Sequence, residues 1–315
     1  MYTPYDIRYA IIVLIVCLII TFALFIPIFI STSNSSTPKA KTIELDTSLN
    51  QFYNPYDLQQ LDSRCNLSGS QNNQNDLGLE QIYVINIDRY PERYEYVASQ
   101  LNNLGLTNYQ KWIGTDGFYV PDEQLLNLGI SSELAHRRGL AGCAASHIRL
   151  WRHIVENKLG WVLILEDDAH FHPDFVRLFG TYMSQMTNIN NALMIFPGYC
   201  GNEDIEEIEK SETPIINEPV MCLHGYMISH IGAKYLLDNL LPMKEPVDIT
   251  IIKHFRETKL RGCYAFNGNV IVDGIRPHDY KEKNGARCQF SGIIYQNQRD
   301  RGSTIHKPEI VYEHK

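Results

Sequence analysis

The chain has 315 residues and a formal net charge of −8 at pH 7, with 44% hydrophobic and 20% charged residues. This length allows one or two folded domains with a substantial hydrophobic core. The acidic balance and the lack of a long basic block argue against a nucleic-acid-binding surface. Seven cysteines without a CxxC pair indicate no zinc site, and their spacings fix no disulfide connectivity.

An apolar run covers residues 10–30, broken only by Thr21 and, near its end, Pro27. It is long enough to cross a bilayer as a helix, whereas a cleaved signal peptide has a shorter apolar core and a small-residue cleavage site. Two N-glycosylation sequons follow, at Asn34 and Asn66, which fits a luminal domain. We therefore predict a cytosolic tail over 1–9, one membrane anchor over 10–30, and a type II protein facing the ER or Golgi lumen.

Residues 31–80 are rich in Ser, Thr, Asn and Gln and show little apolar periodicity. Such a composition is typical of a flexible stem. We expect the folded domain over 81–298 and a polar tail over 299–315.

The folded domain begins with a strand pattern at residues 82–87. Pro91 suits the first turn of a helix that continues over 94–104, and Gly105 ends it. A second strand is expected over 109–113. The turn carries Arg89 and Arg93, which could hold a nucleotide's phosphate or form structural ion pairs with acidic residues.

Small residues at 141–145 allow close backbone approach at the start of the next expected helix, with Ser146 and His147 in its first turns. Leu150 and Ile154 lie at helical spacing and should face the core. A histidine inside a helix is more often structural than catalytic, and both possibilities stay open.

The apolar run 161–165 predicts a buried strand of a parallel sheet, and it ends in three carboxylates, Glu166, Asp167 and Asp168. Burying three carboxylates without a partner would be very costly. We therefore place them at the strand's C-terminal end, in the crevice where open α/β sheets bind ligands. Their oxygens suit Mg²⁺ or Mn²⁺, which can carry a nucleotide's phosphates. Alternatively, they open a solvated loop or cap the helix after Pro173.

Further strands are expected over 193–196 and 221–229, and further helices over 232–241 and from Val247 onward. Asp248 lies at the start of that last helix. It either caps the helix or acts as a general base that takes a proton from an acceptor hydroxyl.

Several of these segments, in this order, resemble glycosyltransferase family 25, which includes bacterial lipooligosaccharide galactosyltransferases and animal procollagen galactosyltransferases. The similar segments lie at 85–89, 142–147, 164–168, 225–234 and 246–248, and the resemblance covers roughly 81–294. Two departures concern acceptor choice more than the reaction: Ala145 precedes Ser146 where the family usually has Leu, and Tyr90 replaces a second Arg.

The resemblance implies an α/β fold of the GT-A type, with a mixed, mostly parallel central sheet. It also implies inverting transfer of a sugar, often galactose, from a UDP-sugar to a glycan or glycosylated protein. Residues 166–168 resemble the family's counterpart of the metal-binding DxD motif. We expect Asp168 to bind Mn²⁺ or Mg²⁺ directly, Glu166 to bind it through water or to bind the ribose, and His278 to complete the site. The residues expected to contact the donor are Asn86, Asp88, Arg89, Arg93, Ser146, His147 and Glu166.

If strand geometry continues to Asp168, the side chains of Glu166 and Asp168 point the same way and Asp167 points oppositely. Asp167 would then matter more to the local fold than to the metal.

Two other functions stay open. The chain could be a non-catalytic relative that binds a glycan or a cell-surface partner, although a binding module does not need three adjacent carboxylates. It could instead be another metal-using enzyme such as a phosphodiesterase, but the dense His/Asp clusters of a two-metal hydrolase are missing from the sequence.

Overall fold

A computed structural model describes residues 77–187, 189–200, 211–284 and 292–296 of the chain, without the side chains of 281–284. Within these ranges, no helix combines the length and hydropathy needed to cross a bilayer. The predicted cytosolic tail, anchor and C-terminal tail, both sequons and nearly all of the stem lie outside them.

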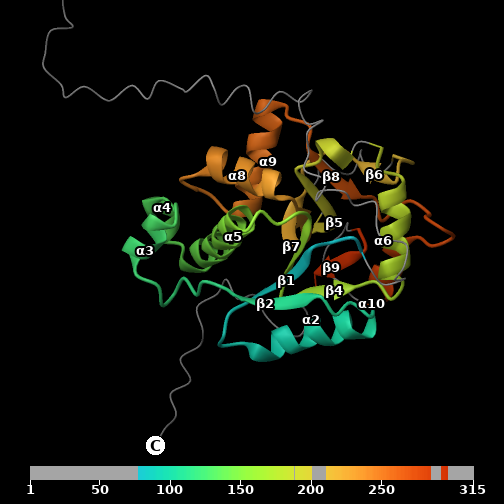
Figure 1. Ribbon diagram of the computed structural model, residues 1–315, viewed down its shortest axis with the longest axis horizontal. Helices are drawn as coiled ribbons and strands as arrows, with labels where there is room; N and C mark the ends of the chain where they lie inside the picture. The colour runs from blue at the N-terminus through green and yellow to red at the C-terminus, as the bar shows by residue number, and fades with distance from the viewer. Residues whose placement is uncertain (1–76, 188, 201–210, 285–291, 297–315) are drawn as a thin grey trace, which may run out of the picture. The chain divides into compact units, whose positions relative to one another are not determined.

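In the described residues, nine strands form one sheet, with the path β2-β1-β3-β7-β5-β8-β6 and with β4 and β9 paired beside it (Figure 1). Four of the eight strand pairings are parallel and four are antiparallel. The prediction of a mixed sheet is confirmed, but the prediction that it is mostly parallel is wrong, because β7 runs antiparallel between β3 and β5. The strands are β1 (Gln81–Asn86), β2 (Tyr109–Ile113), β3 (Val162–Glu166), β4 (Ala169–Phe171), β5 (Met194–Cys200), β6 (Ile215–Ile216), β7 (Met221–Ile228), β8 (Cys263–Phe266) and β9 (Ile294–Gln296).

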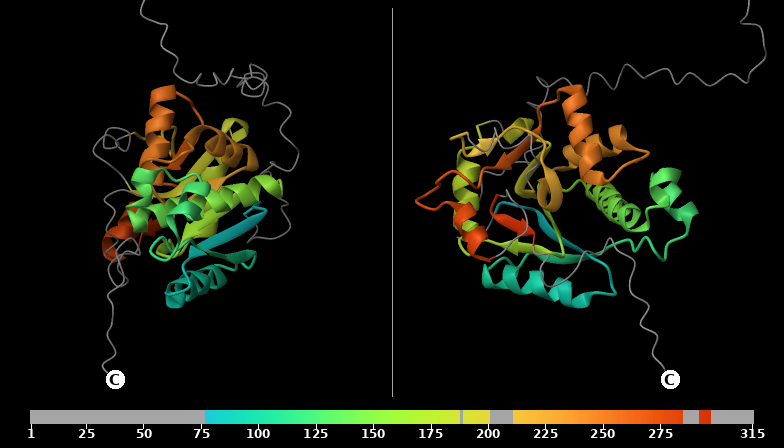
Figure 2. Two further views of the ribbon diagram at one scale, coloured as in Figure 1. Left: turned by 90° about the vertical axis from the view of Figure 1, so that its left-hand side faces the viewer. Right: turned by 180° about the vertical axis from the view of Figure 1, so that it is seen from behind.

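Helices cover both faces of this sheet (Figures 1 and 2). On one face, α5, α8 and α9 enclose a hydrophobic core with Val162 and Ile164 of β3. On the other, α2 and α6 pack over Leu163 and Leu165. The helices are α2 (Pro91–Asn103), α3 (Asp122–Asn127), α4 (Ser132–Ala135), α5 (Arg138–Glu156), α6 (Phe175–Ser184), α8 (His230–Leu240), α9 (Val247–Thr258) and α10 (Pro277–Asn284), with a 3-10 turn, η4 (Ile189–Asn191).

The strand β3 lies inside the sheet, between β1 and β7. Its residues Val162 to Leu165 are fully buried, because each face of the sheet carries its own core. A strand buried on both faces has a continuous apolar sequence instead of an alternating one, which confirms the predicted buried strand. The predicted parallel pairing holds only toward β1, because β3 is antiparallel to β7.

The helix α5 begins earlier than predicted, at Arg138, so that Ser146 and His147 lie in its third turn. Gly142 explains why small residues occur here. A Cβ atom on Gly142 would lie 2.6 Å from the backbone nitrogen of Gly117 and 2.6 Å from the carbonyl oxygen of Thr115. The loop after β2 thus packs against the second turn of α5.

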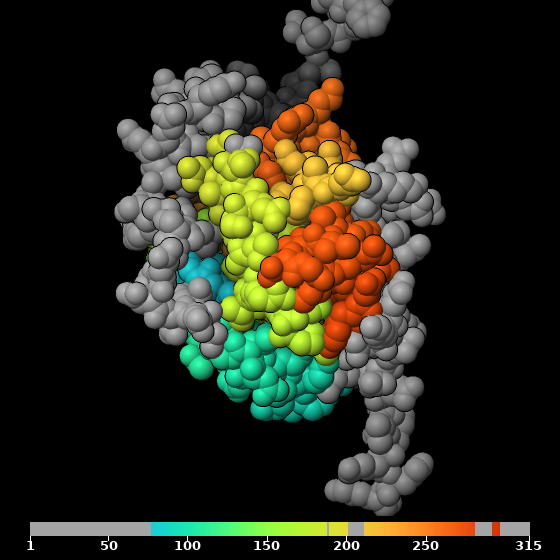
Figure 3. Space-filling view, turned by 90° about the vertical axis from the view of Figure 1, so that its right-hand side faces the viewer, coloured from blue at the N-terminus to red at the C-terminus, as the bar shows by residue number. Residues whose placement is uncertain are grey.

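The face that carries α2 and α6 also carries the segment that leads into α10 (Figure 3). Arg177 of α6 forms an ion pair with Asp273 of that segment. The predicted strand β2 and helix α2 are confirmed, and Gly105, with a φ of 74°, follows the end of α2 as expected.

Candidate active site

A cavity of about 400 Å³ opens at the C-terminal ends of β1 and β3. Its walls come from the turn after β1, the loop after β2, the first half of α5, and the starts of β7 and α9. Most of the predicted site residues meet here, although they are spread over more than 160 positions of the chain. They are Asn86, Arg89, Arg93, Ser146, His147, Glu166, Asp168 and Asp248.

Asp167 is held in place by two of the residues that were predicted to bind the donor. Its Oδ2 accepts a hydrogen bond of 2.7 Å from Asn86 Nδ2, and its Oδ1 accepts one of 2.7 Å from Arg93 Nε. All three residues are at least 95% buried. The structural ion pair that was the alternative for Arg93 is therefore present, and it ties α2 to the turn after β3.

Glu166, the last residue of β3, presents its carboxylate to the cavity. Its Oε1 lies 3.2 Å from His147 Nε2. Burial raises the pKa of Glu166, but the hydrogen bond from His147 and the nearby charge of Arg93 lower it, and the net shift is downward. Glu166 is therefore an ionised carboxylate at neutral pH.

Asp168 is 93% buried, and its two oxygens differ. Oδ2 accepts a hydrogen bond of 3.0 Å from Gln296 Nε2, whereas Oδ1 is buried without a hydrogen-bond partner among the described residues. Burial and the neighbouring charges of Glu166 and Asp167 raise the pKa of Asp168 to about 7. A buried carboxylate oxygen without a partner is costly unless a proton or a cation joins it.

The three carboxylates differ in environment because of a turn. The strand β3 ends at Glu166, and Asp167 and Asp168 form a turn before β4. The premise that strand alternation continues to Asp168 is therefore wrong. Asp167 nevertheless binds Asn86 and Arg93, which fits its expected part in the local fold.

Ser146 and Arg89 also line the cavity, with partners of their own. Ser146 Oγ accepts a hydrogen bond from the backbone nitrogen of Thr115 and donates one to the carbonyl oxygen of Gly142, both 2.7 Å long. This serine joins α5 to the loop after β2. Arg89 Nε lies 2.6 Å from Asp116 Oδ2, and its guanidinium group is 4.8 Å from the ring centre of Tyr90.

Asp248 lies in the first turn of α9 and also reaches β7. Its Oδ1 accepts a hydrogen bond of 2.9 Å from the backbone nitrogen of Ile249, and its Oδ2 accepts one of 3.2 Å from that of Cys222. Cys222 has a φ of 67°, in the left-handed region that residues other than glycine rarely adopt. Asp248 is therefore not the N-cap of α9, which is Pro246, but its carboxylate accepts a backbone hydrogen bond in the first turn and also faces the cavity.

Two predicted residues lie apart from the cavity lining. Asp88 is exposed and pairs with Lys111 Nζ at 3.0 Å, so the expected donor contact is not supported. His278 lies at the start of α10, where its backbone nitrogen donates to the carbonyl oxygen of Gly268. His278 is not among the residues that line the cavity, and its neighbours Pro277 and Tyr280 contact Tyr295 of β9 and His170 of β4.

Sequence reasoning missed Gln296, which reaches Asp168 from 128 positions away. Its place depends on the pairing of β4 with β9, where Gln296 lies opposite Ala169. It also missed the loop after β2, whose Thr115, Asp116 and Phe118 line the cavity. No local pattern marks either feature.

Residues 79–251 match the family described as glycosyltransferase family 25 (LPS biosynthesis protein). The chain belongs to glycosyltransferase family 25. It is 29% identical to a "Glycosyltransferase 25 family member" of Aedes aegypti over 220 residues, which cover 64% of this chain and 35% of that protein. It is 26% identical over 205 residues to "Procollagen galactosyltransferase 2" of Homo sapiens, covering 56% of this chain and 31% of that protein.

Another relative carries a different description. The "Inactive glycosyltransferase 25 family member 3" of Homo sapiens is 23% identical over 202 residues, covering 58% of this chain and 33% of that protein. The chain spans about a third of the length of these animal relatives. The matched family segment includes the cavity residues from Asn86 to Asp248 and ends before Gln296 and His278.

Proposed function

We propose that this chain is an active glycosyltransferase that moves a hexose from a UDP-sugar to a glycan or glycosylated protein, and that the hexose is galactose. Family membership supports the reaction class. The cavity at the ends of β1 and β3 supports the place, because open α/β sheets bind their ligands there. The similarity to procollagen galactosyltransferase 2 supports galactose and a protein-bound acceptor.

The observation that carries the proposal is the buried, unpartnered Oδ1 of Asp168 in the cavity wall. Among the described residues, Cys143 and His147 both contact Glu166 at Oε1, which leaves Oε2 for a ligand. These oxygens suit Mn²⁺ or Mg²⁺, and Asp168 and Glu166 would hold it. When bound, such a cation stabilises the negative charge that develops on the departing diphosphate.

The chain's own residues organise this site. Arg93 and Asn86 hold Asp167, and this fixes the turn on which Asp168 sits. We propose that Arg89, which lines the same cavity, contacts the donor, with its charge partly offset by Asp116.

Asp248 is the candidate general base. Each of its oxygens accepts one backbone hydrogen bond and has a second lone pair. Asp248 can thus take the proton of an acceptor hydroxyl while it holds α9 and β7 together. One carboxylate base is sufficient for the inverting reaction that we propose.

The test is a turnover screen of the full chain with UDP-galactose and UDP-glucose, with added Mn²⁺ and with a chelator. We expect UDP release with Mn²⁺ that falls to background when the cation is removed. Turnover that is equal with and without the cation would contradict metal dependence. No UDP release with any donor, together with intact UDP binding, would instead support a non-catalytic relative, the alternative to which the human inactive family member points.

We also propose that the apolar run 10–30 anchors the chain as a type II protein with residues 81–298 in the ER or Golgi lumen. In sealed microsomes, added protease should leave the large domain intact, and glycosidase treatment should remove glycans from Asn34 or Asn66. If the protease digests the domain and neither asparagine carries a glycan, the orientation is opposite to the one proposed.

A further inference from the structure

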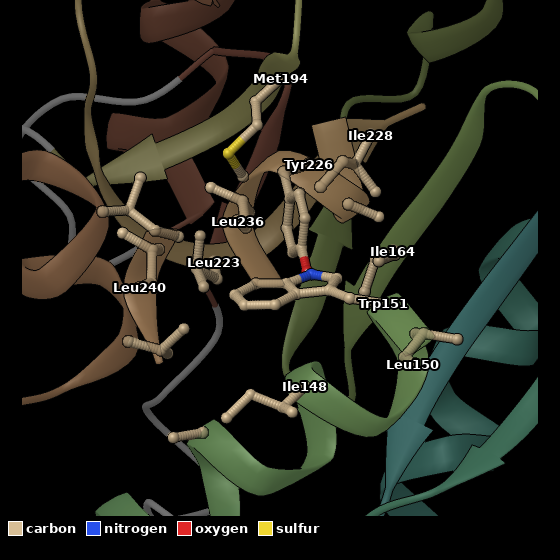
Figure 4. Close-up of a cluster of buried hydrophobic side chains, with 14 of the residues drawn as sticks. Ile148, Leu150, Trp151, Ile164, Met194, Leu223, Tyr226, Ile228, Leu236 and Leu240 are labelled. Atoms are coloured by element: carbon tan, nitrogen blue, oxygen red, sulfur yellow. The ribbon is translucent and has the colours of Figure 1, made fainter. Parts of the chain in front are cut away.

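Three buried side chains connect the core beneath the sheet to the cavity. Trp151 Nε1 lies 2.9 Å from the hydroxyl oxygen of Tyr226, which lies 2.9 Å from His147 Nδ1. His147 Nε2 then lies 3.2 Å from Glu166 Oε1. Trp151 and Tyr226 are fully buried and His147 is 99% buried, so water does not compete for these bonds. Figure 4 shows the indole nitrogen of Trp151 directed at the Tyr226 oxygen.

The chemistry of the first member sets the direction of every hydrogen bond. An indole N–H can only donate, so the Tyr226 oxygen accepts from Trp151. The one hydrogen of the Tyr226 hydroxyl then goes to His147 Nδ1, which must carry a lone pair. The remaining ring hydrogen sits on Nε2 and points at the Glu166 carboxylate.

The other states of His147 satisfy this arrangement less well. With the hydrogen on Nδ1, the Nε2 lone pair would face a carboxylate oxygen at 3.2 Å, which is repulsive. With hydrogens on both nitrogens, Nδ1 would donate to Tyr226, and the Tyr226 hydrogen would lose its acceptor among the described residues. A buried donor without an acceptor is costly.

We propose that Trp151 and Tyr226 are positioning residues that hold His147 as the Nε2–H tautomer, and that His147 thereby holds Glu166 Oε1 and leaves Oε2 directed to the cavity. The part of this proposal in which Glu166 Oε2 serves a cation and a donor rests on the proposed function, whereas the tautomer of His147 does not. Both ring nitrogens of His147 are occupied, so this histidine acts through Glu166 instead of contacting the donor directly. Tyr226 and Trp151 lie outside the cavity lining and act only through His147.

The first experiment measures the tautomer by long-range ¹H–¹⁵N correlation spectra of the full chain labelled at histidine. His147 is assigned by the signals that disappear in His147→Gln, or by contacts with the Tyr226 ring. We expect a neutral ring with its hydrogen on Nε2 at pH 7.5. A hydrogen on Nδ1, or on both nitrogens, would overturn the proposal, and this result needs no variant of the other two residues.

The second experiment removes the Tyr226 hydroxyl in Tyr226→Phe. Tyr182→Phe is the matched control, because Tyr182 is also fully buried and donates to the carbonyl oxygen of Asn267, away from the cavity. We expect both variants to lower the melting temperature to a similar extent. In Tyr226→Phe alone, the His147 signals should lose the single Nε2–H form.

The same pair of variants tests the link to Glu166. Mn²⁺ binding measured by calorimetry should weaken about tenfold in Tyr226→Phe, as is common when a residue that orients a ligand is removed, and should not change in Tyr182→Phe. Equal Mn²⁺ affinity in the two variants would overturn the link. If the wild-type chain binds no Mn²⁺ and turns over no donor, the proposed function fails, and the histidine spectra still decide on the tautomer.

Discussion

Arg93 pairs closely with Asp167 and reaches Asp168 only at the limit of an ion-pair distance. Its Nη2 lies 2.5 Å from Asp167 Oδ1 but 4.0 Å from Asp168 Oδ2, and all three side chains are buried. Asp167 therefore receives the closer contact with the Arg93 charge, whereas Asp168 Oδ1 has no hydrogen-bond partner among the described residues. Asp167 thus forms a structural pair, and Asp168 is the carboxylate at which we propose that the cation binds.

Replacement of Arg93 should be strongly destabilising, because it leaves the Asp167 carboxylate buried and unpaired. We expect Arg93→Ala to lower the free energy of unfolding by about 3–5 kcal/mol in urea titrations. The control is Lys253→Ala, which removes an exposed ion pair with Glu245 and should cost less than about 1 kcal/mol. Similar losses in the two variants would show that the buried pair has no special weight.

Gly142 should tolerate no side chain, because a Cβ atom there meets backbone atoms of the loop after β2 at 2.6 Å. We expect Gly142→Ala to destabilise the fold by about 1–3 kcal/mol, as overpacking does, and to weaken donor binding by displacing that loop. Gly180→Ala on α6 is the control, since nothing lies within 4 Å of its Cβ position and alanine favours helices by about 1 kcal/mol. The melting temperature should therefore fall in Gly142→Ala and rise in Gly180→Ala. A rise in both variants would contradict the close approach of the loop to Gly142.

Gly142 also illustrates which features could be predicted from the sequence alone. The buried strand β3, the helix α2 and the small-residue stretch of α5 are encoded in short local patterns, and each was predicted within a few residues of its observed place. The role of Ser146 was not predicted. It depends on a hydrogen bond with Thr115 in the loop after β2, and this loop lies close to α5 because Gly142 has no side chain.

The strands β4, β6, β8 and β9 escaped prediction for a related reason. They have two to four residues each, and long-range pairing defines them instead of a periodic pattern. The contact of Gln296 with Asp168 depends on such a pairing, and the expectation for His278 rested on similarity to enzymes that supply a late ligand. Motif order indicated which residues to examine, but only the fold showed which of them meet.

Asp248→Asn should fold and should lose transfer more than it loses donor binding. A general base acts on the acceptor, so we expect the transfer rate to fall by about 100-fold or more while UDP affinity stays within about threefold. Asp238→Asn is the control, because Asp238 is an exposed partner of Lys234 outside the cavity. Normal transfer by the folded Asp248→Asn variant would show that Asp248 only joins α9 to β7 and is not the general base.

The stability of the cation-free protein should depend on pH through Asp168. Because the folded protein raises the pKa of Asp168 from 3.8 to about 7, it binds more protons than the unfolded chain between these values, and stability falls as pH rises through this window. We expect Asp168→Asn to remove that fall and to exceed the wild type by on the order of 1–3 kcal/mol at pH 8 in a chelator. Melts at pH 5 and 8 measure the difference, and saturating Mn²⁺ should stabilise only the wild type. A wild type that is equally stable at both pH values would contradict the raised pKa of Asp168.

The central claim is that Asp168 holds the cation that the UDP-sugar donor needs, and it is tested most directly by Mn²⁺ titration of donor turnover in Asp168→Asn and Asp167→Asn. Loss of the ligand should raise the barrier by several kcal/mol, because the departing diphosphate is no longer neutralised. We predict that Asp168→Asn loses turnover and its response to Mn²⁺ while thermal melting shows a folded protein. Asp167→Asn, which disturbs the pair with Arg93, should lose stability first and keep its response to Mn²⁺. If Asp168→Asn turns over donor normally and still responds to Mn²⁺, the cation binds elsewhere and the assignment of this site is wrong.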